Sequence, residues 1–175
     1  MARFLFYDDM MINLLIKREK PAGGAAVQAY GWIRGLLEAG EDVQLLTHLP
    51  GDEVLKEECS GITLLPLYEK GKGLRWLRWI YYRIPYLYRA IKQSKPDYFY
   101  DGVPNWKSFL FGIICRHLKI RFILRISNDC LVDERVHKSR SGVHLYFQRL
   151  GMKLSYCILC QNEYQYNIIR NKFPG

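Results

Sequence analysis

Several features of common protein classes are missing from this sequence. It has no run of about 18 uninterrupted apolar residues, so no membrane span is predicted. Its first residues, MARFLFYDDMM, place two aspartates after a short apolar stretch and do not resemble a secretory signal. No internal repeat and no low-complexity tract occurs. With 49% hydrophobic and 25% charged residues, the chain is expected to be globular rather than disordered.

Cysteine is present in an odd and scattered set of five. A secreted disulfide framework has an even number at tight spacing, so reduced thiols and a cytoplasmic location are predicted. One CxxC occurs, at Cys157 and Cys160, but no second pair completes a zinc site. We therefore predict core thiols and no metal.

The usual nucleotide and catalytic motifs are also missing. There is no GxGxxG, no GKS or GKT, and no GxSxG. The balance of 26 basic against 17 acidic residues, +9, nevertheless favours anionic partners such as nucleotide phosphates, nucleic acid or an anionic membrane. Because no RNP signature, zinc motif or recognition-helix pattern occurs, we predict no nucleic-acid partner.

Apolar runs of strand length alternate with helix-length segments. The predicted strands are 3–7, 42–47, 62–66, 98–101, 121–126 and 156–160, and the predicted helices are 25–39, 74–92, 106–118, 143–154 and 163–171. This alternation predicts an α/β fold: one Rossmann-like domain over residues 1–175 with a doubly wound, mainly parallel sheet flanked by helices.

Ligands of such sheets bind at the carboxyl ends of the strands. Five polar residues at predicted strand ends are therefore candidate binding residues: Asp101, Arg125, Asn128, Asp129 and Gln161. Arg125 offers planar donors for an acidic sugar or a phosphate. The others have a structural alternative, since Asp and Asn also hold turns and Asn162 is well placed to cap the last helix. The long segment 129–142 is either functional or simply a solvated loop.

Gly23 and Gly24 precede the helix predicted at 25–39. The helix would turn one apolar stripe to the core, formed by Val27, Tyr30, Ile33 and Leu37, and Gly40 would end it as a left-handed cap. The glycine pair has two interpretations. It is either a plain strand-to-helix turn or a loop that lets phosphates approach free N–H groups at the helix start.

The segment GLRWLRWIYYRIPYLYRAIKQSKPD resolves into two helical stripes, with Pro85 predicted to kink it. The aliphatic stripe is assigned to the core and consists of Leu77, Ile80, Ile84, Leu87 and Ile91. The second stripe is aromatic and basic and consists of Arg75, Trp79, Tyr82, Tyr86 and Arg89. It could lie at an anionic membrane surface, or its rings could pack under a neighbouring loop with the arginines reaching outward.

Four stretches in order resemble the N-terminal domain of GT-B glycosyltransferases, especially glycosyltransferase family 4. They are PAGGAAVQAYGWIRGLLEAGEDVQLLT, KPDYFYDG, RFILRISND and YCILCQNEYQYNIIRNKFPG. The resemblance implies the acceptor-side domain of a retaining, hexosyltransferase-type enzyme that uses a nucleoside diphosphate sugar and no cofactor. Its acceptor would be a glycan or a lipid-linked glycan in surface polysaccharide synthesis, and the protein would be cytoplasmic or peripheral on the inner membrane face.

The resemblance also assigns roles to residues. Gly23 and Gly24 would lie at the donor phosphates, and Asp101, Arg125, Asn128, Asp129 and Gln161 would face the acceptor. Family members carry a second, donor-binding domain with paired glutamates, which we expect to be absent from this chain or supplied by a partner chain. Alone, the chain would be inactive or weakly active, and no catalytic residue is assigned. The alternatives are a non-catalytic module that recruits a partner to a membrane, or an unrelated nucleotide-binding Rossmann domain.

Overall fold

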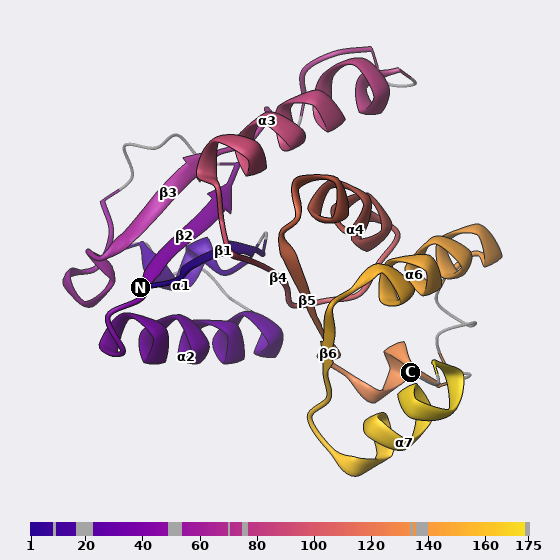
Figure 1. Cartoon of the computed structure of the whole chain (residues 1–175). Helices are drawn as coiled ribbons and strands as arrows, with labels where there is room; N and C mark the ends of the chain where they lie inside the picture. The colour runs from indigo at the N-terminus through magenta and orange to yellow at the C-terminus, as the bar shows by residue number, and fades with distance from the viewer. Residues whose placement is uncertain are drawn as a thin grey trace. The chain divides into compact units, whose positions relative to one another are not determined.

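The computed structural model describes residues 1–8, 10–16, 23–48, 54–69, 71–74, 77–133, 135 and 140–173. Its strands form a six-stranded parallel sheet in the order β3-β2-β1-β4-β5-β6 (Figure 1). The strands are β1 (Arg3–Tyr7), β2 (Asp42–Thr47), β3 (Ile62–Pro66), β4 (Tyr98–Asp101), β5 (Arg121–Arg125) and β6 (Cys157–Leu159). The helices are α1 (Ile12–Leu15), α2 (Gly24–Glu38), α3 (Ile84–Ser94), α4 (Lys107–Leu118), α6 (Gly142–Leu154) and α7 (Glu163–Lys172). The predicted Rossmann-like α/β fold is confirmed.

The chain divides into two compact units, Met1–Tyr98 and Phe99–Gly175. In the first, β2 pairs with both β1 and β3, with Phe4 opposite Val43 and Val43 opposite Ile62. Helices α2 and α3 lie on opposite sides of these strands (Figure 1). Both faces of the sheet are therefore covered, which explains why β2 carries a nearly continuous buried run of side chains.

Helix α2 buries a stripe that matches the predicted one only in part, since Ile33 is buried and Tyr30 and Leu37 are half-buried. Ala26, Ala29 and Ile33 are buried, whereas Val27 is about half exposed. The two stripes lie side by side on the helix and share the same i+3/i+4 spacing. The stripe with two alanines is the buried one, since small side chains let the helix lie close to the sheet. The predicted cap is confirmed, because Gly40 has a φ of +77° and Glu41 N–H bonds back to the Leu36 carbonyl at 2.9 Å.

The segment before α3 departs most from prediction. Instead of one kinked α-helix, a π-helical turn, η2 (Trp79–Arg83), leads directly into α3. A residue before proline is usually biased away from helical angles, but Ile84, which precedes Pro85, keeps them (φ −64°, ψ −47°). In an unbroken α-helix the proline ring would meet the carbonyl four residues back, and the wider π turn before it relieves that clash. Of the predicted aliphatic stripe, Leu87 and Ile91 are buried but Leu77 and Ile80 are exposed.

The second unit is built around the close packing of α4 on α6. A Cβ added at Gly151 in α6 would lie 2.7 Å from the Ser108 backbone carbon, and one at Gly112 would lie 2.7 Å from Leu154 Cβ. Glycine at these points permits the short distance between the helices. In the core of this unit the Phe99 ring packs at a tilt against two neighbours, with ring centres 5.0 Å from Phe111 and 5.9 Å from Phe122. Among the described residues, no helix has both the length and the hydropathy needed to cross a bilayer.

Candidate functional site

The candidate site lies in the second unit, at the carboxyl ends of its strands. β4 ends at Asp101 and β5 ends at Arg125, which are both predicted site residues. β6 runs parallel to β5, and Ile126 N–H extends their ladder by donating to the Leu159 carbonyl at 2.9 Å. Because parallel strands end at the same edge, Asp101, Arg125 and the residues after β5 and β6 share that edge.

Arg125 is the most unusual side chain at this edge. It is only 3% exposed, and its Nε and Nη2 atoms have no hydrogen-bond partner among the described residues. A buried charged donor without an acceptor is costly, since it has lost its hydration and gained nothing in return. A carboxylate or phosphate would satisfy a guanidinium through two parallel hydrogen bonds. Arg125 is thus chemically suited to an anionic ligand that can reach it.

Asp101 is held inside the fold. The residue is 2% exposed, and its Oδ2 accepts a hydrogen bond from Ser108 Oγ at 2.7 Å. Its Oδ1 accepts from Val103 N–H at 3.3 Å, and Ser108 Oγ itself accepts from Asn105 N–H at 3.0 Å. These contacts fasten the end of β4 to the start of α4. Both carboxylate oxygens are engaged in this turn, and the predicted acceptor role of Asp101 stays a prediction.

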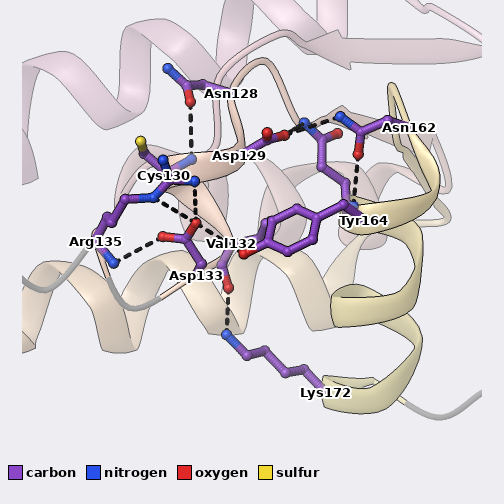
Figure 2. Close-up of polar contacts among 10 residues, drawn as sticks. Asn128, Asp129, Cys130, Val132, Asp133, Arg135, Asn162, Tyr164 and Lys172 are labelled. Atoms are coloured by element: carbon purple, nitrogen blue, oxygen red, sulfur yellow. Dashed lines mark hydrogen bonds and ion pairs between the residues drawn. The ribbon is translucent and has the colours of Figure 1, made fainter.

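Asn128 and Asp129 organise the chain after β5. Asn128 Oδ1 accepts from Cys130 N–H at 2.9 Å and caps the short 3-10 turn η3 (Asp129–Leu131). Asp129 Oδ1 accepts from Gln165 Nε2 at 2.7 Å and from Asn162 Nδ2 at 3.2 Å (Figure 2). These hydrogen bonds lower the pKa of the Asp129 carboxyl below its usual value, so it stays ionised well into acid.

Gln165 is a residue of this edge that sequence reasoning missed. It lies on α7 and is fully buried, and it joins two predicted site residues. While its Nε2 donates to Asp129, its Oε1 accepts from Gln161 N–H at 2.8 Å. The predicted cap at Asn162 is confirmed, since its Oδ1 accepts from Gln165 N–H at 2.8 Å. The spacing of Gln165 to the buried Ile169, i to i+4, is the signal that places it on the inward face of α7.

The segment expected to be a long loop is partly fastened where it is described. Lys172 Nζ donates to the Val132 carbonyl, and Arg135 pairs with Asp133 and lowers the pKa of that carboxyl (Figure 2). Arg140 donates to the Pro104 carbonyl at 2.7 Å. Residues 134 and 136–139 lie outside the described part of the chain. Among described residues, no group of three His, Cys, Asp or Glu side chains could hold a metal ion.

The predicted phosphate loop lies in the first unit. Gly23 is the residue before α2, with an extended backbone (φ −73°, ψ 158°), and Gly24 begins the helix. A Cβ added at either glycine would meet nothing within 4 Å, and no described side chain caps the helix start. Neither backbone angle nor packing requires glycine here. Glycine is nevertheless an ordinary residue at a helix N-cap, so the plain turn and the phosphate loop both stay predictions.

Part of the aromatic stripe packs against Tyr68, which follows β3. Tyr68 lies 6.1 Å from the Trp79 ring and 6.2 Å from the Tyr82 ring, and Tyr82 lies 4.7 Å from Tyr86. The Arg83 guanidinium lies over Tyr68 and Trp79, 5.1 and 4.8 Å from the ring centres. Arg89 is exposed, and Arg75 lies outside the described residues. The membrane role of this stripe stays a prediction.

Comparison with protein-family models gives no match, and comparison with curated proteins gives none either. Among solved structures, this chain is similar to sucrose-phosphate synthase from Thermosynechococcus elongatus, with a TM-score of 0.61 and 14% sequence identity. The similarity covers 98% of this chain but only 45% of that one. At this identity the similarity shows the fold alone, a Rossmann-like α/β domain, and it does not single out glycosyltransferase family 4.

Proposed function

We propose that this chain is the acceptor-side domain of a glycosyltransferase that uses a nucleoside diphosphate sugar. The observation that carries the proposal is Arg125, a buried guanidinium at the carboxyl end of a parallel strand, whose Nε and Nη2 find no partner among the described residues. Strand ends are where such sheets bind ligands. The structural similarity to a glycosyltransferase supports the reaction class.

In the proposed reaction, an acceptor hydroxyl forms a bond to the anomeric carbon of the donor sugar. The bond from that carbon to the diphosphate breaks, and the hydroxyl proton leaves with a base that this chain does not identify. The negative charge that builds up on the departing diphosphate needs preorganised positive groups. We assign that task in part to the N–H groups at the start of α2, next to Gly23 and Gly24. Net retention of anomeric configuration is the outcome that the family resemblance favours.

Within the same proposal, the edge of the second unit binds the acceptor. Arg125 would pair with an anionic group of a sugar acid or a sugar phosphate, and Gln161 would hydrogen-bond a hydroxyl. Asn128 and Asp129 would present the segment that follows β5, which their hydrogen bonds hold in place. Most of the donor-binding surface would come from a second domain or a partner chain. Lipid-linked or surface glycans are the acceptors that we propose.

The proposal is tested by titrating the chain with hexose phosphates, hexuronic acids and the matching neutral hexoses, using calorimetry or ligand-observed NMR. The wild type should bind the anionic sugars at least about tenfold more tightly than the neutral ones. Arg125→Met should erase that difference. Arg116→Met, which removes an exposed arginine of α4, should keep it. Equal affinity for charged and neutral sugars in the wild type would overturn the proposal.

Stability separates a binding role for Arg125 from a structural one. Removing a buried donor that has no partner should leave the free energy of unfolding unchanged or raise it by about 1–3 kcal/mol. A loss of stability in Arg125→Met would mean that the guanidinium holds the fold. A parallel titration with NAD and with a nucleoside diphosphate sugar tests the alternative, since binding of NAD in place of the sugar nucleotide would favour an unrelated Rossmann domain.

A further inference from the structure

An apolar surface of the first unit is exposed just before α3. Leu74 is 70% exposed and Ile80 is 72% exposed, and Leu77 and Tyr81 are each at least half exposed. We refer to these four residues as the apolar ridge. The helical pattern predicted that Leu77 and Ile80 face the core, whereas in the structure they face the solvent. Single exposed apolar residues are ordinary, but four close together along one segment mark an interaction surface.

The four side chains follow successive turns of the backbone. Leu77 N–H bonds to the Leu74 carbonyl at 3.1 Å, and Ile80 N–H bonds to the Leu77 carbonyl at 2.9 Å. Residues three and four apart in such turns share one side. The other side is already covered, because Trp79, Tyr82 and Arg83 pack around Tyr68.

The shape of the ridge is fixed in advance. The Tyr81 hydroxyl accepts a hydrogen bond from Leu74 N–H, which ties the start of the ridge to the π turn. Gly73 has a φ of +92°, and a Cβ there would lie 2.7 Å from the Tyr81 oxygen. A larger residue would therefore disturb this tie. The ridge is thus part of a hydrogen-bonded structure, and its exposure does not come from a frayed end.

The charge around the ridge is mainly positive, although Glu69 lies just before it and pairs with Lys72 at 3.7 Å. Between residues 70 and 96 the sequence contains eight Lys and Arg residues and no Asp or Glu. In the described part, Arg89 and Lys92 are exposed on α3, and Lys92 reaches over the Tyr88 ring at 6.0 Å. An apolar side within a mainly cationic segment complements a surface that is apolar inside and anionic at its boundary, which is the chemistry of an anionic bilayer.

A protein partner fits the ridge less well. A stable interface between proteins takes about 20 to 30 residues on each side, far more than four side chains. A bilayer needs no such matched area, because a few apolar side chains can enter the headgroup region while nearby cations stay among the headgroups. The size of the ridge and its charge therefore both favour lipid.

We propose that the apolar ridge docks the chain on an anionic membrane surface, with Leu74, Leu77, Ile80 and Tyr81 entering the headgroup region. The flanking cations contact lipid phosphates. This inference concerns a different side of the segment from the aromatic stripe, and it does not depend on the proposed transfer reaction. It gives the protein a peripheral site of attachment through the first unit.

Co-sedimentation with vesicles tests the inference. The wild type should bind vesicles that contain phosphatidylglycerol and should bind pure phosphatidylcholine vesicles weakly. Raising NaCl from about 50 mM to about 300 mM should weaken the binding. The double variant Leu77→Ser, Ile80→Ser should reduce it about tenfold or more, since two apolar side chains lose their burial.

A matched control is available in the same chain. Val54 and Val143 are 64% and 66% exposed but lie outside the ridge. The double variant Val54→Ser, Val143→Ser should bind vesicles like the wild type, and both double variants should keep the thermal midpoint because the side chains are exposed. A ridge variant with a lower thermal midpoint than the wild type would show that these side chains support the fold and would overturn the inference.

Three further results would overturn it. The first is equal vesicle binding by the ridge variant and the wild type, and the second is a wild type that binds neither vesicle. The third is self-association of the wild type in ultracentrifugation that the ridge variant loses while vesicle binding persists, because the ridge would then join two copies. Sugar titration measures none of these effects, so failure here and failure of the glycosyltransferase proposal are distinguishable.

Discussion

Gly24 occupies the first helical position of α2, where alanine is well tolerated and nothing stands in the way of a Cβ. Replacing it with alanine should therefore leave the free energy of unfolding unchanged or raise it by up to about 1 kcal/mol. If phosphates approach the backbone here, the added methyl should nevertheless weaken binding of a nucleoside diphosphate sugar. Thermal unfolding and a donor titration measure the two effects.

Gly31, in the middle of the same helix, provides the control. It also has open space around its Cβ position. Gly31→Ala should raise stability by about 0.5–1 kcal/mol and leave donor binding unchanged. If Gly24→Ala bound the donor as the wild type does, the glycine pair would be a plain turn and its assignment to the phosphates would be wrong.

Asp129 makes the stability of the second unit depend on pH. Hydrogen bonds from Gln165 and Asn162 lower its pKa in the folded chain, whereas an unfolded aspartate titrates near about 3.9. Because the folded value is the lower one, the stabilisation is fully present above about pH 4 and is lost as pH falls through the folded pKa. Asp129→Asn should therefore be less stable than the wild type at pH 7, and the gap should narrow at pH 3. Urea midpoints at the two pH values measure it, and a constant gap would contradict it.

The candidate site at the carboxyl ends of β4, β5 and β6 could be predicted only in part from the sequence. Arg125 and Asp101 follow from the rule that ligand-binding groups gather at strand ends, and the structure places both residues there. The rule does not say whether a side chain is free. Asp101 accepts a hydrogen bond from Ser108, 7 residues along the chain, whereas Nε and Nη2 of Arg125 have no partner among the described residues, and the strand-end rule predicts neither. Gln165 was not predicted as a residue of this edge, because a glutamine on a short helix is most often at the surface.

The strands and four of the five predicted helices lie within one residue of their predicted bounds, and only the helix predicted at 74–92 differs strongly. The strands β1 to β4 have the predicted bounds, β5 ends one residue earlier than predicted, and β6 is one residue shorter at each end. Their apolar runs are short, continuous and bounded by polar residues, so few alternatives exist. The segment before α3 has apolar residues on both stripes, and periodicity alone cannot say which side faces the core. The π turn at η2 shifts the register as well, and nothing in a 3.6-residue period anticipates it.

The crossing of α4 and α6 gives an element-level prediction. A methyl at Gly151 would lie 2.7 and 2.8 Å from backbone atoms of α4, which cannot move aside without separating the helices. Gly151→Ala should therefore destabilise the chain by about 1–3 kcal/mol, despite the better helix propensity of alanine. Urea unfolding followed by circular dichroism measures the loss.

Gly142 is the matched control on the same helix. It begins α6, and a Cβ there meets nothing within 4 Å. Gly142→Ala should leave stability within about 0.5 kcal/mol of the wild type or raise it slightly. If both alanine variants had the same effect, the close approach of α4 and α6 would not be a constraint on stability.

The charge of the whole chain affects every binding measurement made on it. A net charge of +9 attracts any polyanion through long-range forces, whether or not a specific site exists. Such attraction is screened within about 10 Å at 0.1 M salt. A buried group such as Arg125 is screened much less, because its interactions act over contact distances in a medium with little water. Salt dependence can therefore separate general attraction from binding at the proposed site.

Duplex DNA of arbitrary sequence should accordingly bind weakly and lose at least about tenfold in affinity between about 50 and about 300 mM NaCl. An anionic sugar bound at Arg125 should lose much less over the same range, about threefold, and Arg125→Met should remove only this salt-resistant part. Fluorescence anisotropy with labelled DNA and calorimetry with the sugar measure the two. DNA binding that persists at high salt and depends on sequence would instead make nucleic acid a specific partner, contrary to the absence of any recognition motif in the chain.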